Sequence, residues 1–141
     1  MALVSVIHGP NLNLLGTREV SVYGRQTLAE IEAELASSAI ELGLELECYQ
    51  SNHEGGIVDR VQSLRGRADV LILNAGGYTH SSVAIRDAVA AIAPEIPTLE
   101  VHLSIPEARE AFRQHSLLAG VVRGRIEGFG GLSYLLALHA A

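Results

Sequence analysis

Short apolar segments with the pattern of β-strands alternate with amphipathic, helix-like segments about five times along the 141 residues of the chain. The run Val70–Leu73 is apolar throughout, which is typical of a strand buried on both faces. Strands that alternate with helices build a parallel sheet with helices on both faces. We therefore predict an α/β fold in one domain, residues 1–141, with the flavodoxin-like strand order 2-1-3-4-5. The predicted strands are residues 2–7, 44–50, 70–73, 97–101 and, more weakly, 120–122.

Sequence signals also mark where helices begin. Three helices open with a capping box, in which serine or threonine is followed three residues later by glutamate. An early proline adds to the third of these signals. The boxes are Thr27–Glu30, Ser51–Glu54 and Ser104–Glu107, and the other predicted helices run from about His80 to Ile92 and over residues 131–139.

The composition excludes several classes of protein. All ten basic residues are arginines, so no lysine is present to form a Schiff base, to attach pyridoxal phosphate or to serve a phosphate-binding loop. The net charge is −6 and no basic stretch occurs, so we expect no nucleic-acid partner. The single cysteine, Cys48, is expected to be a buried small apolar residue without a disulfide partner.

The hydrophobic content, 48% with a mean hydropathy of +0.26, is high for a domain of this size. The surplus predicts contacts between subunits, and hence a homo-oligomer. No apolar run approaches the roughly 20 residues that span a bilayer, and no basic leader precedes the first strand. We expect a cytoplasmic location and no membrane contact.

Three polar segments follow predicted strands and mark the expected site. They are residues 8–26, 74–80 and 100–104. In parallel sheets, ligands bind beyond the carboxyl ends of the strands. With strands one, three and four as neighbours, all three segments line one crevice, which is the main argument for a site.

The first segment contains Asn11 and Tyr23, with Arg18 and Arg25 around the tyrosine. A loop this long in a compact domain is usually functional, often as a lid over a site. A phenol is a weak base at neutral pH, but neighbouring guanidinium groups favour its charged form. The simpler alternative is a tyrosine that covers apolar surface beside solvated arginines.

In the third segment, Glu100 and His102 are two residues apart on a strand and so share a face. A carboxylate beside an imidazole orients it and favours its protonated form, as a general acid requires. A surface ion pair is the alternative. The next helix would present the backbone N–H groups of Leu103 and Ser104 to an anion. Arg109 and Arg113 are four apart and would share a face of that helix, or be simply solvated.

The second segment, residues 74–80, contains glycines that let the backbone approach a ligand closely, but it lacks a dinucleotide-binding pattern. His80 and Asp87 are seven apart, which places them on one helix face but too far apart for one metal ion. His80 is otherwise a polar residue of a first helical turn. The histidines form no close pair at metal-ligand spacing, so we expect no metal site, and no serine-hydrolase motif occurs.

Taken together, these motifs resemble those of type II dehydroquinases. The resemblance covers nearly the whole chain, in order and at the family's spacing. Its parts are His8-Gly-Pro-Asn-Leu-Asn-Leu-Leu-Gly16, Thr17-Arg-Glu19, Tyr23-Gly24, Gln50-Ser-Asn-His-Glu-Gly55, Asn74-Ala-Gly-Gly-Tyr-Thr-His80, Ile85-Arg-Asp87, Glu100-Val-His-Leu-Ser104 and Ala108-Arg-Glu-Ala-Phe-Arg113.

The resemblance implies dehydration of 3-dehydroquinate to 3-dehydroshikimate by anti elimination through an enolate, without cofactor or metal. It implies a dodecamer of four trimers, and a role in the shikimate pathway or in quinate breakdown. The resemblance implies that Tyr23 is the base, with Arg18 as its supporting cation, and that His102, supported by Glu100, is the acid. Asn11 would hold a water for the enolate, Arg109 would be a lid contact, and Asp87 would contact a neighbouring site. The implied substrate contacts are Asn74, Gly76, His80, Arg113 and the backbone of Leu103 and Ser104.

The chain departs from the family pattern at a few positions. His8 stands where the family usually has asparagine, Val20 replaces the usual proline, and residues 105–107 replace a segment that begins with asparagine. The last change removes a side-chain amide near the expected carboxylate cradle. A binding domain that lost catalysis is therefore a competing hypothesis, and a flavin-binding module is a more distant one.

Overall fold

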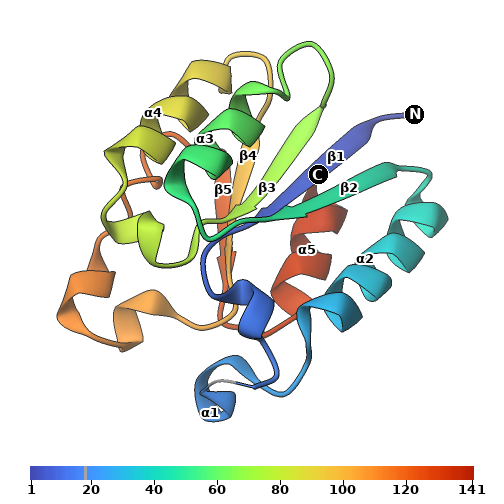
Figure 1. Cartoon of the computed structure of the whole chain (residues 1–141). Helices are drawn as coiled ribbons and strands as arrows, with labels where there is room; N and C mark the ends of the chain where they lie inside the picture. Colours follow the sequence, from blue (N-terminus) through green and yellow to red (C-terminus); the bar gives the residue numbers. More distant parts are fainter. Residues whose placement is uncertain (18) are drawn as a thin grey trace.

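The structure, a computed structural model, describes residues 1–17 and 19–141, so Arg18 lies outside the described residues. Five parallel strands form a sheet in the order β2-β1-β3-β4-β5 (Figure 1). The flavodoxin-like order predicted from the sequence is therefore confirmed. The strands are β1 (Leu3–His8), β2 (Glu45–Gln50), β3 (Val70–Asn74), β4 (Thr98–His102) and β5 (Gly124–Glu127).

Helices cover both faces of the sheet. In Figure 1, α2 and α5 lie on one face and α3 and α4 on the other. Short helical turns occupy the loops at the carboxyl ends of β1, β3 and β4. The α-helices are α1 (Val20–Tyr23), α2 (Leu28–Leu42), α3 (Glu54–Gln62), α4 (Val83–Ile92) and α5 (Leu132–Ala140), and the 3-10 turns are η1 (Leu12–Leu14), η2 (Gly76–His80), η3 (Pro106–Ala108) and η4 (Ala111–Gln114).

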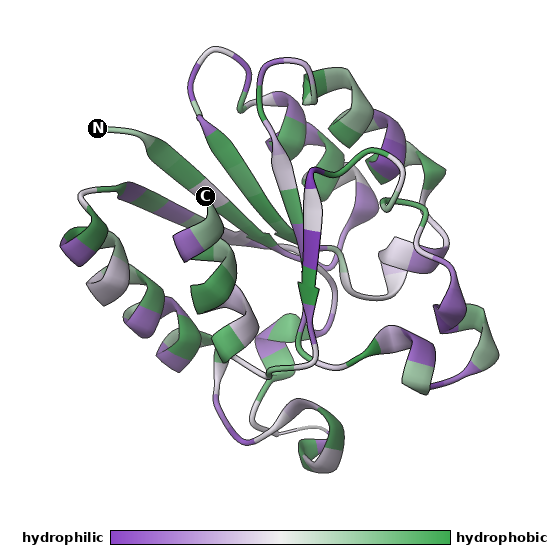
Figure 2. Cartoon of the chain, turned by 180° about the vertical axis from the view of Figure 1, so that it is seen from behind, coloured by the Kyte–Doolittle hydropathy of each residue, from purple (hydrophilic) through white to green (hydrophobic). Residues whose placement is uncertain are grey.

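The central strand β3 supplies apolar side chains to both faces of the sheet. Ile72 packs into the core beneath α2 and α5, whereas Leu71 and Leu73 pack beneath α3 and α4. All three are fully buried, as the continuous apolar run predicted. Figure 2 shows β1 and β3 as hydrophobic, while the edge strands β2 and β5 carry hydrophilic residues. No helix in residues 1–17 or 19–141 is both long and apolar enough to cross a bilayer.

The predicted fifth strand, residues 120–122, is wrong. The N–H groups of Val121 and Val122 close a turn on the carbonyl oxygen of Leu118, so they are not available to a strand. The strand begins at Gly124, which pairs with Leu99 of β4. Both valines pack against the core, and this explains why they resembled a strand. The true edge strand is more polar because one of its sides is open to solvent.

Of the three capping boxes, that of Thr27 and Glu30 is confirmed, with both reciprocal hydrogen bonds present. The pair Ser51–Glu54 is wrong, because α3 has His53 as its N-cap and Ser51 Oγ accepts from the His53 N–H instead. The pair Ser104–Glu107 is also wrong. There Ile105 precedes a 3-10 turn that starts at Pro106, and two such turns replace the expected α-helix.

The helix expected from about His80 to Ile92 is divided into two elements. His80 belongs to η2, and α4 begins only at Val83, with the Ser82 side chain accepting from the Ile85 N–H at 3.0 Å. Consequently His80 and Asp87 do not share a helix face. Because Ser82 offers a better cap than His80, the helix begins later than periodicity suggested.

Candidate active site

A cleft of about 600 Å³, counted with the open space at its mouth, lies where β1, β3 and β4 end. Ligands bind at this edge in open parallel sheets. The register brings the walls together, because His8 at the end of β1 pairs with Asn74 at the end of β3. Most of the predicted site residues line the cleft: Asn11, Tyr23, Asn74, Gly76, His80, His102, Leu103, Ser104, Arg109 and Arg113.

Three predicted site residues are not among those lining the cleft. Glu100 is fully buried behind His102. Asp87 is exposed on α4, where Arg86 donates to its carboxylate at 3.0 Å. Arg18 lies outside the described residues, so its expected place beside the tyrosine stays a prediction.

The structure also adds residues that the sequence analysis did not single out. Ser116 and Arg125 contact Glu100 from segments that carry no recognisable motif, so no local signal indicated them. The added wall residues are sequence neighbours of predicted ones, and they shape the cleft with apolar or backbone surface. They are Pro10, Leu12, Gly77 and Pro106.

The carboxylate of Glu100 holds the imidazole of His102. Glu100 Oε2 lies 2.6 Å from His102 Nε2, as expected for two residues on the same face of β4. Ser116 Oγ lies 3.1 and 2.9 Å from the two Glu100 oxygens and can donate to either, and Arg125 Nε lies 3.4 Å from Oε1. These groups compensate the charge of a carboxylate that is fully buried. The imidazole is thereby oriented, and Nδ1 of His102 is left for a ligand.

The amide of Asn74 is held at both ends. Its Nδ2 donates to Tyr134 Oη at 3.1 Å, and its Oδ1 accepts from the backbone N–H of Gly76 at 3.1 Å. Tyr134 Oη also lies 2.9 Å from Nδ1 of His8. Burial raises the pKa of Tyr134, so its hydroxyl stays neutral and able both to donate and to accept. The orientation of the Asn74 amide therefore depends on β1 and α5 as well as on β3.

Amide side chains at the end of β2 anchor the loop that follows β1. Gln50 Nε2 donates to the carbonyl oxygen of Gly9 and to Asn52 Oδ1, both at 3.1 Å. Asn52 Oδ1 also accepts from the backbone N–H of Asn11 at 3.0 Å. Asn11 has φ 69°, a left-handed conformation that asparagine adopts more readily than most residues. The anchored loop presents Asn11 at the cleft.

Tyr23 is half-buried at the end of α1 and reaches both the core and the cleft. Its ring packs against the core beneath α2 and α5. The guanidinium of Arg109 lies over the ring, 5.0 Å from its centroid. A cation over an aromatic face is attracted by about 0.5–2 kcal/mol. Arg109, which directly follows η3, thus places a cation against Tyr23.

His80 and Arg113 enter the cleft from η2 and η4. Nδ1 of His80 lies 2.8 Å from the carbonyl oxygen of His115, and since a carbonyl only accepts, Nδ1 carries the proton. Nε2 of His80 is therefore left as an acceptor for a ligand hydroxyl. Arg113 Nε donates to the carboxylate of Glu110. A backbone hydrogen bond and this arginine hold the pKa of Glu110 below its usual value.

These groups suit a small hydroxylated anion and acid–base chemistry. Two fixed cations, Arg109 and Arg113, face the cleft, and amide and imidazole groups are placed to bind hydroxyls. The phenol of Tyr23 and the oriented imidazole of His102 both line the cleft. Because acid and base stand on separate elements, the arrangement can protonate one substrate atom while removing a proton from another.

Comparisons with known proteins point to one family. The family model described as "Dehydroquinase class II" matches residues 2–141. A 3-dehydroquinate dehydratase of Desulforudis audaxviator is 51% identical over 138 residues, which cover 98% of this chain and 91% of that protein. One of Geotalea daltonii is 53% identical over 137 residues, covering 97% and 94%. The crystal structure of a type II dehydroquinase from Butyrivibrio crossotus has a TM-score of 0.96 at 40% identity, covering 99% of this chain and 96% of that one.

Proposed function

The chain belongs to the class II dehydroquinase family and is a hydro-lyase, a 3-dehydroquinate dehydratase, and from this premise we propose how its cleft removes water. The proposed reaction is an anti elimination through an enolate, with 3-dehydroshikimate as product. The observation that carries it is that Tyr23 and His102, which Glu100 orients, line the same cleft. The whole of residues 1–141 acts as one catalytic domain in this proposal.

The proposed first step is loss of the proton next to the ketone. The phenolate of Tyr23 accepts this proton, and the C–H electron pair becomes the enolate. Arg18 supports the phenolate, and Arg109 lies over the ring. A water held by Asn11 donates to the enolate oxygen, where charge develops.

The proposed second step is departure of the hydroxyl group. His102, oriented by Glu100, donates a proton to this oxygen as the C–O bond breaks and the enolate collapses to the conjugated enone. Water leaves, and exchange with solvent returns Tyr23 and His102 to their starting protonation states. The acid and base come from β4 and α1, and this supports departure of the proton and the hydroxyl on opposite faces of the substrate.

The proposed substrate contacts follow the charges of the cleft. The backbone at Leu103 and Ser104 takes the carboxylate, and Gly76 lets the backbone approach the ring closely. Asn74, His80 and Arg113 contact the hydroxyls. No metal or organic cofactor takes part in this proposal, since side chains supply both proton transfers. The same reaction serves the shikimate pathway, with aromatic amino acid biosynthesis, or quinate breakdown.

The direct test is turnover of 3-dehydroquinate by the purified protein in the presence of a chelator, followed by the absorbance of the conjugated enone. Tyr23→Phe should lower kcat by about 100-fold or more, the range typical of a lost general base. Tyr49→Phe is the matched control, because Tyr49 lies on β2 and packs beneath α3. Full activity of Tyr23→Phe would refute the base assignment. Substrate binding without turnover by the unaltered protein would instead identify a binding domain that lost catalysis.

We further propose a cytoplasmic dodecamer of four trimers in which Asp87 reaches the cleft of a neighbouring subunit. The exposed carboxylate of Asp87 and the exposed Val83 on the same helix, α4, support a contact there. Asp87→Asn should weaken substrate binding, although Asp87 does not line the cleft of its own chain. Sedimentation equilibrium tests the subunit number, and a fully active monomer would contradict this arrangement.

A further inference from the structure

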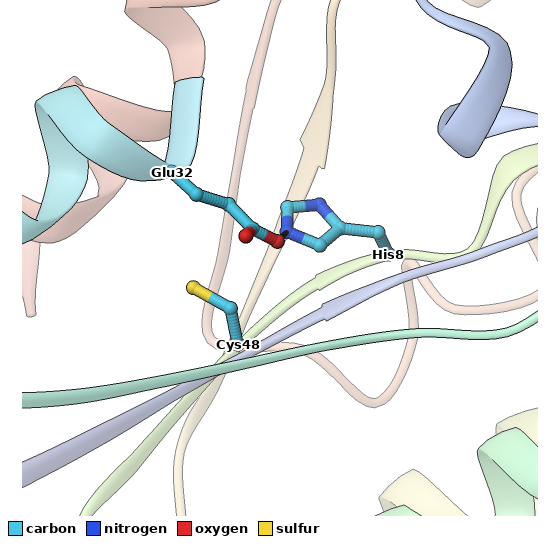
Figure 3. A group of neighbouring side chains, drawn as sticks. All are labelled: His8, Glu32 and Cys48. Carbon is cyan, nitrogen blue, oxygen red and sulfur yellow. Dashed lines mark ion pairs between the residues drawn. The ribbon is translucent and has the colours of Figure 1, made fainter. Parts of the chain in front are cut away.

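Three side chains that no step above uses lie together beneath α2. They are His8 at the end of β1, Cys48 on β2 and Glu32 on α2 (Figure 3). A nitrogen of His8, an oxygen of Glu32 and the sulfur of Cys48 all lie within 4.8 Å of one another. The sheet register explains the grouping, because Cys48 pairs with Val6, which shares a strand face with His8.

His8 is the observation that points to a ligand. Its side chain is fully buried, and Nδ1 is engaged by Tyr134 Oη at 2.9 Å. Nε2 lies 3.2 Å from Glu32 Oε1, yet it makes no hydrogen bond among the residues that the structure describes. A buried polar atom without a partner costs about 1–3 kcal/mol, so such atoms call for an explanation. An ion between Nε2 and the carboxylate would give both atoms a partner.

The donor set identifies the class of ion. Imidazole nitrogen, thiolate sulfur and carboxylate oxygen are the protein ligands of zinc, and a thiolate disfavours magnesium and calcium. Ligand atoms of a tetrahedral zinc ion lie roughly 3.4–3.6 Å apart, given bond lengths of about 2.0–2.3 Å. The Nε2–Oε1 separation of 3.2 Å is already close to this spacing. Cys48 Sγ lies within 4.8 Å of both atoms and would have to move closer to complete the set.

We propose that His8 Nε2, Glu32 and Cys48 bind one divalent ion of the zinc class, with the fourth position left for water. Tyr134 supports the site, because its hydroxyl lies 2.9 Å from Nδ1 of His8 and can accept from Nδ1–H in the tautomer in which Nε2 is the ligand. The Glu32 side chain is 35% exposed, which gives the ion a path from solvent. None of the three ligands lines the cleft, so we expect the elimination to proceed without the ion.

The charge around Cys48 also suits a cation. Burial, followed by the charges of Glu32 and Glu47, raises the pKa of Cys48 to about 12. The thiol therefore keeps its proton at neutral pH when the site is empty. The Glu32 carboxylate attracts a cation, and binding of the ion displaces the thiol proton. Among the other groups around the site, Tyr134 stays neutral because burial raises its pKa.

Cobalt(II) is the probe, because a thiolate ligand gives it a charge-transfer band in the near ultraviolet. The protein is first stripped with a chelator and then titrated with Co²⁺. We expect this band to saturate at one ion per chain and to be abolished by added Zn²⁺. We expect the chelator to leave turnover of 3-dehydroquinate intact, so a failure of this proposal can be told apart from a failure of the proposed reaction.

Variants of the three ligands decide the assignment. Cys48→Ser should abolish the band, and Glu32→Gln and His8→Asn should each weaken Co²⁺ binding at least tenfold. His139→Asn, at an exposed histidine of α5, is the matched control and should bind as the unaltered protein does. Circular dichroism identifies any variant that fails to fold, and Glu32→Gln, at a partly exposed position, carries least risk. Absence of the band in the unaltered protein, or unchanged Co²⁺ affinity in Cys48→Ser and Glu32→Gln, would overturn the proposal.

Discussion

Replacement of Tyr134 by phenylalanine tests whether one buried hydroxyl connects the core to the cleft. The phenylalanine ring fills the same fully buried space, so the hydrophobic contribution is retained. The hydroxyl is lost, and with it the contacts to Asn74 Nδ2 at 3.1 Å and to His8 Nδ1 at 2.9 Å. Both partners are themselves buried, so neither gains a full set of water contacts.

The expected loss of stability follows from these two buried groups, which the variant leaves without their hydrogen-bond partner. Each buried polar group left without a partner costs about 1–3 kcal/mol, so we expect Tyr134→Phe to lose about 2–6 kcal/mol of stability. Unfolding entropy of about 2.1 cal/mol/K per residue amounts to about 0.3 kcal/mol/K over the 141 residues. The corresponding fall in Tm is about 7–20 °C. Freed from Tyr134, the Asn74 amide also loses its fixed orientation, and KM should rise several-fold with a smaller change in kcat.

Thermal and urea unfolding at equal protein concentration measure the stability, and initial rates measure KM. Tyr78→Phe is the matched control, because the Tyr78 hydroxyl donates near the surface to the carbonyl oxygen of Asn52 at 3.3 Å, where water replaces it. The control should lose less than about 1 kcal/mol. A Tyr134→Phe protein as stable as the control, with an unchanged KM, would refute the argument that this hydroxyl positions Asn74.

Two further predictions concern backbone packing and pH. Gly9→Ala should cost about 1–3 kcal/mol of stability and raise KM, because its Cβ would lie 2.5 Å from the carbonyl oxygen of Ala75. The control Gly55→Ala in α3 meets nothing within 4 Å, so it should be neutral or stabilise the fold by about 0.5–1 kcal/mol. Unfolding curves of the two variants check this, and equal effects would contradict it. The hydrogen bond from Arg67 holds the pKa of Glu47 below 4.5, so Glu47 stabilises the fold above that pH and this contribution is lost as the pH falls through the lower folded value. Glu47→Gln should therefore cost less than about 1 kcal/mol of stability at pH 7, since the Arg67–Glu47 pair is partly exposed. The stability difference between the variant and the unaltered protein should disappear in acid. Urea midpoints across pH measure this difference, and a difference that stays constant with pH would contradict a stabilising Arg67–Glu47 pair.

The alternation of strands and helices predicted a parallel sheet, and the flavodoxin-like order was predicted for this class of fold. The apolar run Val70–Leu73 predicted a strand buried on both faces, and its residues 71–73 are fully buried in the central strand β3. The Thr27–Glu30 box was predicted correctly since both of its hydrogen bonds lie within one turn. The other two boxes failed because tertiary partners compete for the same groups. Glu54, for example, accepts from Ser82 of a different helix.

The residues of the cleft, like the elements of the fold, were predicted only in part from the sequence. The motifs named the side chains that line it, and the position of Glu100 two residues before His102 predicted their contact, because alternation along a strand is a local property. The sequence contained no sign that Ser116 supports Glu100, or that Arg109 lies over Tyr23. These contacts join segments far apart in the chain.

The sequence by itself thus determined the layered α/β architecture and the chemical groups available at the ends of the strands. Only the tertiary structure decided which of these groups touch, how Tyr134 fixes Asn74, and that His8 meets Glu32 and Cys48. The physical reason is the distance along the chain over which each kind of interaction acts. Hydrophobic periodicity and strand alternation act between residues a few positions apart, whereas hydrogen bonds and ion sites depend on ångström-scale distances set by packing of the whole chain.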